Sequence, residues 1–512
     1  MKMDFKLYFP VAVRLFAGMI LIFLSLDTTA QLRIPNIFTD EMILQRDKEV
    51  NIWGWAKPGI EVEVQLGKAS YRATVKEDST WSVVIPFHRA GGPYLLTVNS
   101  SGEQIKLKDI YFGDIWFCSG QSNMSFQVAQ ANYYEAELKD AEYPLIRELG
   151  LALESTLYPK HDIKETSWKK ASAGTIGKFS AVAWFFAKEL YHKTKVPIGI
   201  IHSSWGGTPI EAFMDDKTLQ VFPAAKKKMD LLSPEFIKAT QLKNIQLVES
   251  SGNPNPKGFI NIRNGYPTLV YNAMVAPFFN FPVKGVLWYQ GEANSDIPAC
   301  FQYEKLLTGM ITSWRTSWKE PDLPFVVVQL ANYRQKVSTV SPISGWAVLQ
   351  EAQYQVSQTL KNVGIVITND IGNPFDAHPK NKQDVGKRSA AVALNKFYGY
   401  KSLVASGPSL RNAEILKDKM ILSFDGIGSG LTAKGGGDLL NGFLIAGEDQ
   451  QFYEATARIS GDQVVVFHKD ILSPTFVRYA FKDNPPAVNF YNKNGFPAVP
   501  FRTDTEKRLD VK

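Results

Sequence analysis

Cysteine is scarce in this sequence, which holds only Cys118 and Cys300 among its 512 residues. A fold held together by several disulfides is therefore excluded. Neither cysteine stands in the spacing of metal ligands, and the six histidines form no zinc-type pattern. A phosphate-binding P-loop motif is missing as well. We therefore expect neither a metal ion nor another cofactor, while the sequence leaves open a bond between the two cysteines.

A strong excess of one charge is also missing. The 57 lysines and arginines and the 50 aspartates and glutamates are interspersed, and the net charge is +7. Without a long basic run, nucleic acid is a poor candidate partner. Hydrophobic residues make up 45% of the chain and aromatic residues 12%, as expected of a globular protein with buried cores. The aromatic content also suits a carbohydrate binder.

Long hydrophobic runs are confined to the N-terminus. Lys2 and Lys6 precede the uncharged apolar run 15–26, and the small residues 28–30 offer a cleavage site. This pattern predicts a signal peptide over residues 1–30, with an uncleaved anchor as the alternative. No later stretch is long and apolar enough to span a bilayer. We expect an exported protein, periplasmic or extracellular, with no stable membrane span after cleavage.

Beyond the signal peptide, the sequence pattern divides the chain into three parts. Residues 31–108 hold short strands of alternating polarity separated by turn signals, which is typical of a β-sandwich-like domain. Residues 109–400 alternate strands and helices, which predicts an α/β domain with a doubly wound parallel sheet. Residues 401–512 return to short strands among glycines and predict a second β domain.

Five buried strands are predicted in the α/β part, covering residues 110–118, 196–201, 283–289, 324–330 and 363–368. Helices are expected from Ser180, from Thr208 and from about Asn381. Residues 126–138 are also compatible with a helix. Residues 214–270 show little regularity, and we expect them to form an insertion around the entrance of the site.

The first predicted strand ends in a cluster of turn formers that contains Ser122. A serine in a turn at the carboxyl end of a sheet strand lies where open α/β sheets place their ligands. Its hydroxyl is therefore a candidate nucleophile. The stretch is not the Gly-x-Ser-x-Gly elbow, because Met124 stands at the position of the second glycine. A serine that only caps the following turn is the alternative.

A serine nucleophile needs a base, and histidine is the usual base near neutral pH. Of the six histidines, His202 and His378 follow predicted sheet strands at their carboxyl ends. His378 has the better context, because Asp376 lies two residues before it and a carboxylate there can orient the imidazole. His202 is the alternative base.

A serine that attacks a carbonyl group also needs hydrogen-bond donors for the oxyanion of the intermediate. The backbone N–H of Ser122 is one candidate. The Gly206-Gly207 turn is another, because residues without side chains let the backbone approach closely. The side-chain amide of Gln290, after the third predicted strand, is the last. A plain tight turn and a strand-end hydrogen bond are the respective alternatives for the glycines and for Gln290.

Four short blocks follow one another along the chain: 120–124 (GQSNM), 205–208 (WGGT), 288–292 (WYQGE) and 376–383 (DAHPKNKQ). Together they resemble the sialate O-acetylesterases, within the SGNH hydrolase superfamily. The resemblance runs from about residue 34 to the C-terminus. It implies a flavodoxin-like catalytic domain with β accessory domains, and a metal-independent hydrolysis of acetyl esters on sugars.

Carried over to this sequence, the resemblance makes Ser122 the nucleophile, His378 the base and Asp376 the residue that orients the base. The acid of the superfamily usually stands three residues before the histidine, where this chain has Phe375. Asp370 is therefore kept as the alternative carboxylate.

Several side chains near these blocks are candidates for binding the sugar, with core packing as the alternative for the aromatic ones: Trp205, Trp288, Asn294 and Tyr333. The expected substrate is an O-acetylated carbohydrate, either O-acetyl sialic acid or an acetylated hemicellulose such as acetylxylan. The family often has an arginine in a segment where this chain has Gln350, which weakens the sialate alternative. A non-catalytic sugar-binding protein on a hydrolase scaffold is the alternative from another class.

Overall fold

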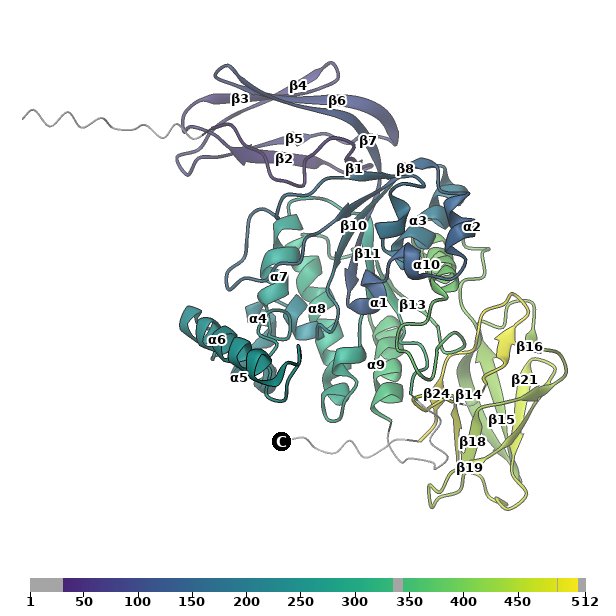
Figure 1. Cartoon of the computed structure of the whole chain (residues 1–512). Helices are drawn as coiled ribbons and strands as arrows, with labels where there is room; N and C mark the ends of the chain where they lie inside the picture. Colours follow the sequence, from purple (N-terminus) through teal and green to yellow (C-terminus); the bar gives the residue numbers. More distant parts are fainter. Residues whose placement is uncertain (1–30, 335–343, 486, 505–512) are drawn as a thin grey trace, which may run out of the picture.

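The computed structural model describes residues 31–334, 344–485 and 487–504. The predicted signal peptide therefore lies outside the described residues. Within the described part, no helix is both long and apolar enough to cross a bilayer. Figure 1 shows a β region at the N-terminal end, a central α/β region, and a second β region toward the C-terminal end.

A central sheet organises the molecule, with seven strands in its main path: β7 Glu103–Gly120, β8 Tyr143–Gly150, β9 Lys169–Ala171, β10 Ile198–Ser204, β11 Gly285–Tyr289, β12 Phe325–Val328 and β13 Val363–Val366. Their spatial order is β13-β12-β11-β7-β10-β8-β9. All neighbours from β13 to β8 pair in parallel, and β9 pairs with β8 in antiparallel. The five predicted strands are present, and β8 and β9 are two that the sequence pattern did not reveal.

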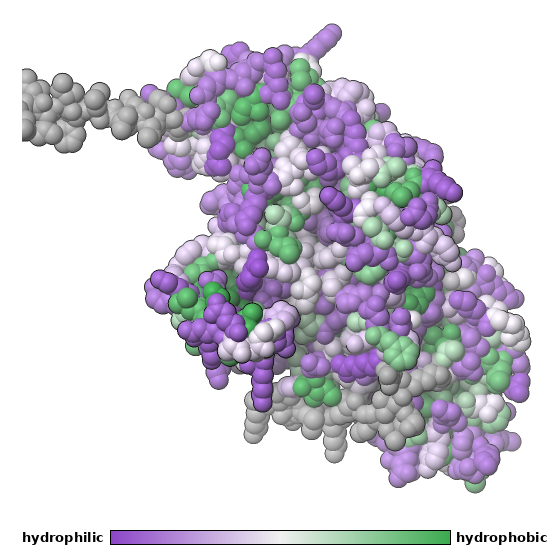
Figure 2. All heavy atoms as spheres, in the orientation of Figure 1, coloured by the Kyte–Doolittle hydropathy of each residue, from purple (hydrophilic) through white to green (hydrophobic). Residues whose placement is uncertain are grey.

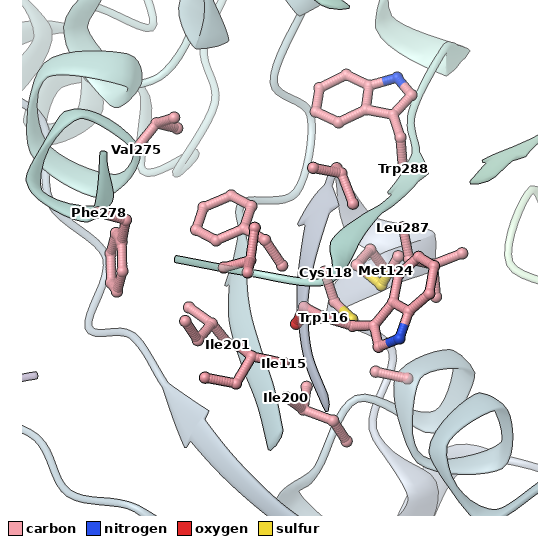
Figure 3. Close-up of a cluster of buried hydrophobic side chains, with 14 of the residues drawn as sticks. Ile115, Trp116, Cys118, Met124, Ile200, Ile201, Val275, Phe278, Leu287 and Trp288 are labelled. Carbon is pink, nitrogen blue, oxygen red and sulfur yellow. Dashed lines mark hydrogen bonds between the residues drawn. The ribbon is translucent and has the colours of Figure 1, made fainter. Parts of the chain in front are cut away.

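Strand β7 lies at the centre of this sheet and extends beyond it. Its first half pairs with strands of the N-terminal β region, and residues 114–120 pair with β10 and β11. It therefore crosses position 108, where a domain boundary is expected, without a linker. Trp116 and Cys118 of β7 lie among buried side chains such as Leu287 and Ile200 (Figure 3). Cys118 and Cys300 are both buried and are not joined to each other.

Helices cover the central sheet in two groups: α3 Ala181–Thr194 packs against α10 Lys382–Phe397, and α8 Tyr303–Ser317 packs against α9 Gly345–Thr359 (Figure 1). The short α7 Leu269–Met274 packs on neighbouring 3₁₀ turns. The Ser180 hydroxyl accepts a hydrogen bond from the N–H of Ala183 at the start of α3. The Asn381 side chain does the same for Asp384 in α10. The helices predicted to begin at Ser180 and Asn381 are thus confirmed.

Two other helix predictions are wrong. Residues 126–138 do not form one helix, because the backbone is extended at Phe126, Gln127 and Ala131 and left-handed at Tyr133. The chain instead makes α1 Ser122–Ser125, a 3₁₀ turn Val128–Gln130 and α2 Tyr134–Leu138. After Thr208 only a single 3₁₀ turn forms, over Ile210–Phe213.

The region 214–270 is more regular than the sequence suggested. It holds α4 Asp216–Leu219, α5 Pro223–Met229 and the 18-residue α6 Pro234–Ser251. A serine cap at Ser233 and a proline in the first turn begin α6, so the start signal was present in the sequence. Only two residues of α6, Thr240 and Asn244, are buried, so the helix has no apolar buried stripe that would have identified it.

The two outer regions are built from antiparallel strands. The N-terminal β region consists of the first half of β7 with β1 Ile43–Gln45, β2 Val50–Trp55, β3 Glu61–Leu66, β4 Ala69–Thr74, β5 Thr80–Ile85 and β6 Gly91–Ser100. In it, β1 pairs in parallel with β7 and the remaining pairs are antiparallel.

The C-terminal β region has its own buried apolar core. Its strands are β14 Ser409–Leu416, β15 Lys419–Asp425, β16 Leu431–Ala433, β17 Leu439–Leu440, β18 Phe443–Ala446, β19 Tyr453–Glu454, β20 Thr456–Ser460, β21 Gln463–Phe467, β22 Phe476–Tyr479, β23 Phe490–Asn492 and β24 Phe501–Arg502. They form sheets in the orders β14-β15-β21-β20-β17, β19-β18-β22-β24 and β16-β23. The surface in the view of Figure 2 is mostly hydrophilic, with hydrophobic residues in small separate groups.

Candidate active site

Strand β7 ends at Gly120, and α1 begins one residue later at Ser122. A Cβ atom on Gly120 would lie 2.0 Å from the carbonyl oxygen of Tyr289 on β11, and the φ angle of Gly120 is +139°. Only glycine fits this close approach between the two strands. The turn therefore sets Ser122 at the carboxyl end of the central strand, where the sequence predicts it.

The structure brings Ser122, His378 and Asp376 together. The Ser122 hydroxyl lies 2.8 Å from Nε2 of His378. Nδ1 of the same ring lies 3.1 Å from a carboxylate oxygen of Asp376, and this oxygen also accepts a hydrogen bond from the backbone N–H of His378 at 2.8 Å. Because Asp376 and His378 share the loop between β13 and α10, one loop holds both the imidazole and the carboxylate. Hydroxyl, imidazole and carboxylate form one chain of contacts, the arrangement that activates a serine.

The alternative base and the alternative carboxylate have other partners. Nδ1 of His202 faces the carboxylate of Glu148 at 3.3 Å. Asp370 is buried in an ion pair with Arg388 at 2.6 Å. Among the described residues, neither His202 nor Asp370 makes a hydrogen bond to Ser122 or to the imidazole beside it. The geometry therefore favours His378 as the base and Asp376 as its carboxylate.

The backbone N–H groups of Ser122 and Gly206 are available as donors beside the candidate nucleophile. A Cβ atom on Gly206 would lie 3.5 Å from Cβ of Ser122, so the two backbones are close. No described residue accepts a hydrogen bond from the N–H of either residue. The side chain of Asn264 donates to the Gly206 carbonyl at 2.9 Å and fixes this turn. Gly207 has a φ of +69°, a left-handed conformation that glycine adopts without strain.

The side-chain amide of Gln290, expected as a further oxyanion donor, is fully buried and bonded within the protein. Its Nε2 donates to Asn294 at 2.8 Å and to Gln121 and the Thr208 carbonyl at 3.2 Å. Its oxygen accepts a hydrogen bond from Tyr303 at 2.7 Å. Gln290 thus braces the loops at the ends of the strands, and it has no donor left over for a substrate oxygen.

Most of the aromatic and amide residues expected to bind sugar do not face an open site. Trp288 is fully buried and packs edge-on against Trp314 (Figure 3 shows Trp288), so its prediction is wrong. Asn294 is also buried, with its amide donating to Glu211 at 2.9 Å. Tyr333 is half-buried and packs against an indole of α9. Trp205 is half-exposed beside the glycine turn and keeps a position near the site.

The Ser122 and His378 side chains line an open cleft of about 900 Å³. Its further walls come from residues that the sequence analysis did not single out: Ser125, Phe126, Ala129, Gln130, Ala131, Asn132, Tyr133 and Lys380. They belong to the irregular segment after α1 and to the histidine loop. Lys380 lies within the block 376–383 but was given no role of its own. No motif marks the other residues, since their place in the cleft depends on the fold of the segment after α1.

The comparisons with known proteins agree with this geometry. The family model described as carbohydrate esterase, sialic acid-specific acetylesterase, matches residues 112–395. The chain belongs to this family. The matched range contains all members of the Ser122, His378 and Asp376 arrangement, so the esterase has its candidate catalytic residues within the part that defines the family.

Individual relatives support the same assignment. Sialate O-acetylesterase of Mus musculus is 31% identical over 426 residues, covering 76% of this esterase and 78% of the mouse protein. The Homo sapiens protein of the same name is 29% identical over 448 residues, covering 81% and 80%. A solved carbohydrate acetylesterase from Xanthomonas citri is 36% identical with a TM-score of 0.82, covering 93% of this chain and all of that one. The fold is thus an α/β fold with a mixed central sheet and additional β sheets.

A buried polar network lies directly behind the candidate nucleophile of this esterase. The Asn123 amide donates to Glu292 at 2.5 Å and to the Ala377 carbonyl at 2.8 Å. The Asn123 oxygen accepts a hydrogen bond from the Lys382 ammonium. Because Asn123 follows Ser122 and Ala377 precedes His378, the network ties the serine turn to the histidine loop.

The charges in this network are strongly affected by burial. Burial lowers the pKa of Lys382 to about 7, against the opposing effect of the Glu292 and Asp376 charges. Burial raises the pKa of the Glu292 carboxyl, opposed by its hydrogen bond from Asn123. In the described part of the esterase, no three His, Cys, Asp or Glu side chains are grouped to hold a metal ion.

Proposed function

We propose that this esterase releases acetate from O-acetylated sugars through an acyl-enzyme on Ser122. His378 takes the hydroxyl proton at Nε2 while the Ser122 oxygen attacks the acetyl carbonyl. The carbonyl oxygen becomes an oxyanion, held by the backbone N–H groups of Ser122 and Gly206. His378 then returns its proton to the sugar oxygen, which leaves as a hydroxyl. Asp376 stabilises the imidazolium in between.

The second half of the reaction uses the same groups. His378 takes a proton from a water molecule, whose oxygen attacks the acetyl carbonyl on Ser122. Collapse of the new intermediate breaks the bond to the serine oxygen, which recovers its proton from His378, and acetate leaves. The observation that supports the proposal is the continuous contact from the Ser122 hydroxyl through His378 to Asp376, all three of which line an open cleft.

For the substrate, we favour O-acetylated sialic acids, with acetylated hemicellulose as the second candidate. The mouse and human relatives are sialate O-acetylesterases by name, whereas the solved Xanthomonas citri relative is a carbohydrate acetylesterase. The glutamine that weakened the sialate alternative, Gln350, is fully buried and donates to the Leu330 carbonyl at 2.7 Å. Gln350 is not among the residues that line the cleft of Ser122, so the residue at this position does not decide between the two substrates here.

The decisive experiment measures acetate released by purified protein from O-acetyl sialic acid, from acetylated xylan and from p-nitrophenyl acetate. We expect turnover of all three to disappear in Ser122→Ala, because the acyl-enzyme cannot form. Acetylation of Ser122, detected by mass spectrometry after rapid acid quenching, would show the intermediate directly. A Ser122→Ala variant with normal p-nitrophenyl acetate hydrolysis would contradict the proposal.

We further propose that residues 109–400 form an SGNH-type, flavodoxin-like catalytic domain between β domains at 31–108 and 401–512, and that residues 1–30 direct export to the periplasm or the medium. The parallel order from β13 to β8 supports the first part. The lysine-flanked apolar run supports the second. Fractionation of the producing cells, with the N-terminus of the mature protein sequenced, tests the export.

A further inference from the structure

The cleft beside Ser122 has one wall that catalysis does not use. This wall is formed by residue 126 and residues 129–133, which lie between α1 and α2, and Lys380 on the histidine loop lines the same cleft. The proposed acyl transfer needs the serine, the imidazole and two backbone donors, and it uses no side chain of residues 126–133. A cleft of about 900 Å³ has the volume of a typical small-molecule site, which is enough for a sugar.

Tyr133 is the most exposed large aromatic residue on this wall. Its side chain is 80% exposed, and its ring makes no aromatic contact or hydrogen bond with a described residue. Its backbone is left-handed, with φ 59° and ψ 31°, a conformation that tyrosine disfavours and glycine or asparagine would adopt more easily. The fold gains nothing visible from this ring. A disfavoured conformation that presents a large ring at the mouth of a cleft is a reason to look for function there.

The Tyr133 backbone is held in place from both sides. Its carbonyl accepts hydrogen bonds from the N–H groups of Ala136 and Glu137 at the start of α2. The preceding N–H, of Asn132, donates to the Lys380 carbonyl at 3.0 Å, and the Gln383 side chain donates to the Asn132 carbonyl. The wall is therefore tied to the loop that carries His378. A ring on such a fixed backbone loses little freedom when a ligand packs on it.

Lys380 supplies the charge of this part of the cleft. It is the one lysine or arginine among the described residues that line the cleft. Its side chain is exposed and forms no ion pair with a described carboxylate. The aspartate of the cleft, Asp376, already faces the imidazole. The Lys380 ammonium is thus available for an anionic group of a ligand.

We propose that Tyr133 and Lys380 form the sugar-recognition subsite of the esterase, and that this subsite takes an acidic O-acetylated sugar. The Tyr133 ring packs against the apolar C–H face of the sugar ring, and the Lys380 ammonium binds the sugar carboxylate. This inference rests on the proposed function, and it assigns the substrate class by charge: sialic acids carry a carboxylate, and the xylose units of hemicellulose do not.

The test compares kcat/KM for O-acetyl sialic acid, for acetylated xylo-oligosaccharide and for p-nitrophenyl acetate, which lacks both a sugar ring and a carboxylate. For Tyr133→Ala we expect the ratio of sugar ester to p-nitrophenyl acetate to fall on the order of tenfold for both sugars. Tyr133→Phe retains the ring and should restore the ratio. Tyr133→Gly fits the left-handed backbone and should match the alanine variant, which separates loss of the ring from misfolding.

For Lys380→Gln we expect kcat/KM for the acidic sugar to fall about fivefold relative to the neutral one, mainly through KM, and the loss to shrink at high salt. Lys380→Arg should restore it. Two matched controls lie outside the cleft: Tyr158, which is 72% exposed, and the exposed Lys139. Tyr158→Ala and Lys139→Gln should leave all ratios at the wild-type value.

Each outcome has a distinct meaning. If p-nitrophenyl acetate hydrolysis depends on Ser122 but the Tyr133 and Lys380 variants keep wild-type ratios, the subsite is wrong and the proposed function stands. If Lys380→Gln affects both sugars equally, the assignment to an acidic sugar is overturned. If the wild-type protein hydrolyses none of the esters, the proposed function is wrong, and so is the subsite that rests on it.

Discussion

At the residue scale, the geometry of Asp376 and His378 sets different expectations for the two side chains. His378 makes the contact with the Ser122 hydroxyl, whereas Asp376 is about half exposed and water can partly replace it. We therefore expect kcat for p-nitrophenyl acetate to fall on the order of 10³ or more in His378→Ala, and on the order of 10² in Asp376→Ala. An Asp376→Ala variant with full activity would show that another group orients the imidazole.

A second prediction concerns Lys382 and the way the free energy of unfolding changes with pH. Its folded pKa of about 7 lies below the ordinary value of 10.5. Between these values the unfolded chain binds a proton that the folded chain does not, so the destabilising effect of this buried lysine is complete below about pH 7 and is relieved as pH rises from 7 toward 10.5. Comparing urea unfolding at pH 6 and pH 9, we expect wild type to gain more on going to pH 9 than Lys382→Met. Lys387→Met, an exposed lysine on the same helix, is the control and should behave as wild type.

The positions of Ser122 and His378 in the candidate site could be predicted from the sequence, because the parallel sheet places them at one edge. Ser122 and His378 each follow a buried strand, and parallel strands bring their carboxyl ends to one edge. Burial is harder to predict: Trp288 and Gln290 have the right chemistry for a substrate contact but point into the protein. Tyr133 was missed because its exposure depends on a left-handed turn that no motif announces.

At the element scale, the central strands were predictable and the segments between them were not. A buried strand is a continuous apolar run, as in β7, β11 and β12, and that signal is local. β8 carries an arginine and a glutamate that are both buried, Arg147 and Glu148, so its composition hides it. The helix expected after Thr208 does not form: the capping residues are followed only by the 3₁₀ turn Ile210–Phe213.

The junction of β7 with β11 is the element-scale feature most open to a direct test. Gly120→Ala would place a methyl group 2.0 Å from a backbone oxygen of β11 at a φ of +139°, so both strand ends must move apart. We expect a loss of about 2 to 3 kcal/mol in unfolding free energy, with loss of esterase activity because the turn carrying the nucleophile shifts. Gly150→Ala is the matched control at the end of β8, where the nearest atom would be 3.8 Å away. Equal effects of the two substitutions would show that the close approach does not matter.

At the scale of the whole molecule, the C-terminal β region is attached next to the candidate site. The Asn369 amide donates to the Ala498 carbonyl at 3.1 Å, and the Tyr491 hydroxyl donates to Asp370 at 2.7 Å. Both partners in the α/β region lie at the start of the loop that carries His378. Tyr491 of β23 and the nearby Ala498 therefore bind the start of the loop on which the imidazole depends, a long-range relation that no local sequence pattern could predict.

Tyr491→Phe tests this relation, because it removes one hydroxyl and little volume. Burial alone would raise the pKa of Asp370, but its ion pair with Arg388 and the Tyr491 hydrogen bond bring that pKa below the ordinary value. Losing a hydrogen bond to a buried carboxylate should cost about 1.5 kcal/mol of unfolding free energy. Because the side chain of Asp370 then keeps only its ion pair with Arg388, the histidine loop should loosen. By the preorganisation argument, kcat should fall by a small factor of about two to five.

Tyr453→Phe removes an exposed hydroxyl of the same region and should change neither the free energy of unfolding nor kcat. A Tyr491→Phe protein that loses stability while keeping its full kcat would separate the C-terminal β region from catalysis and leave it a purely structural role.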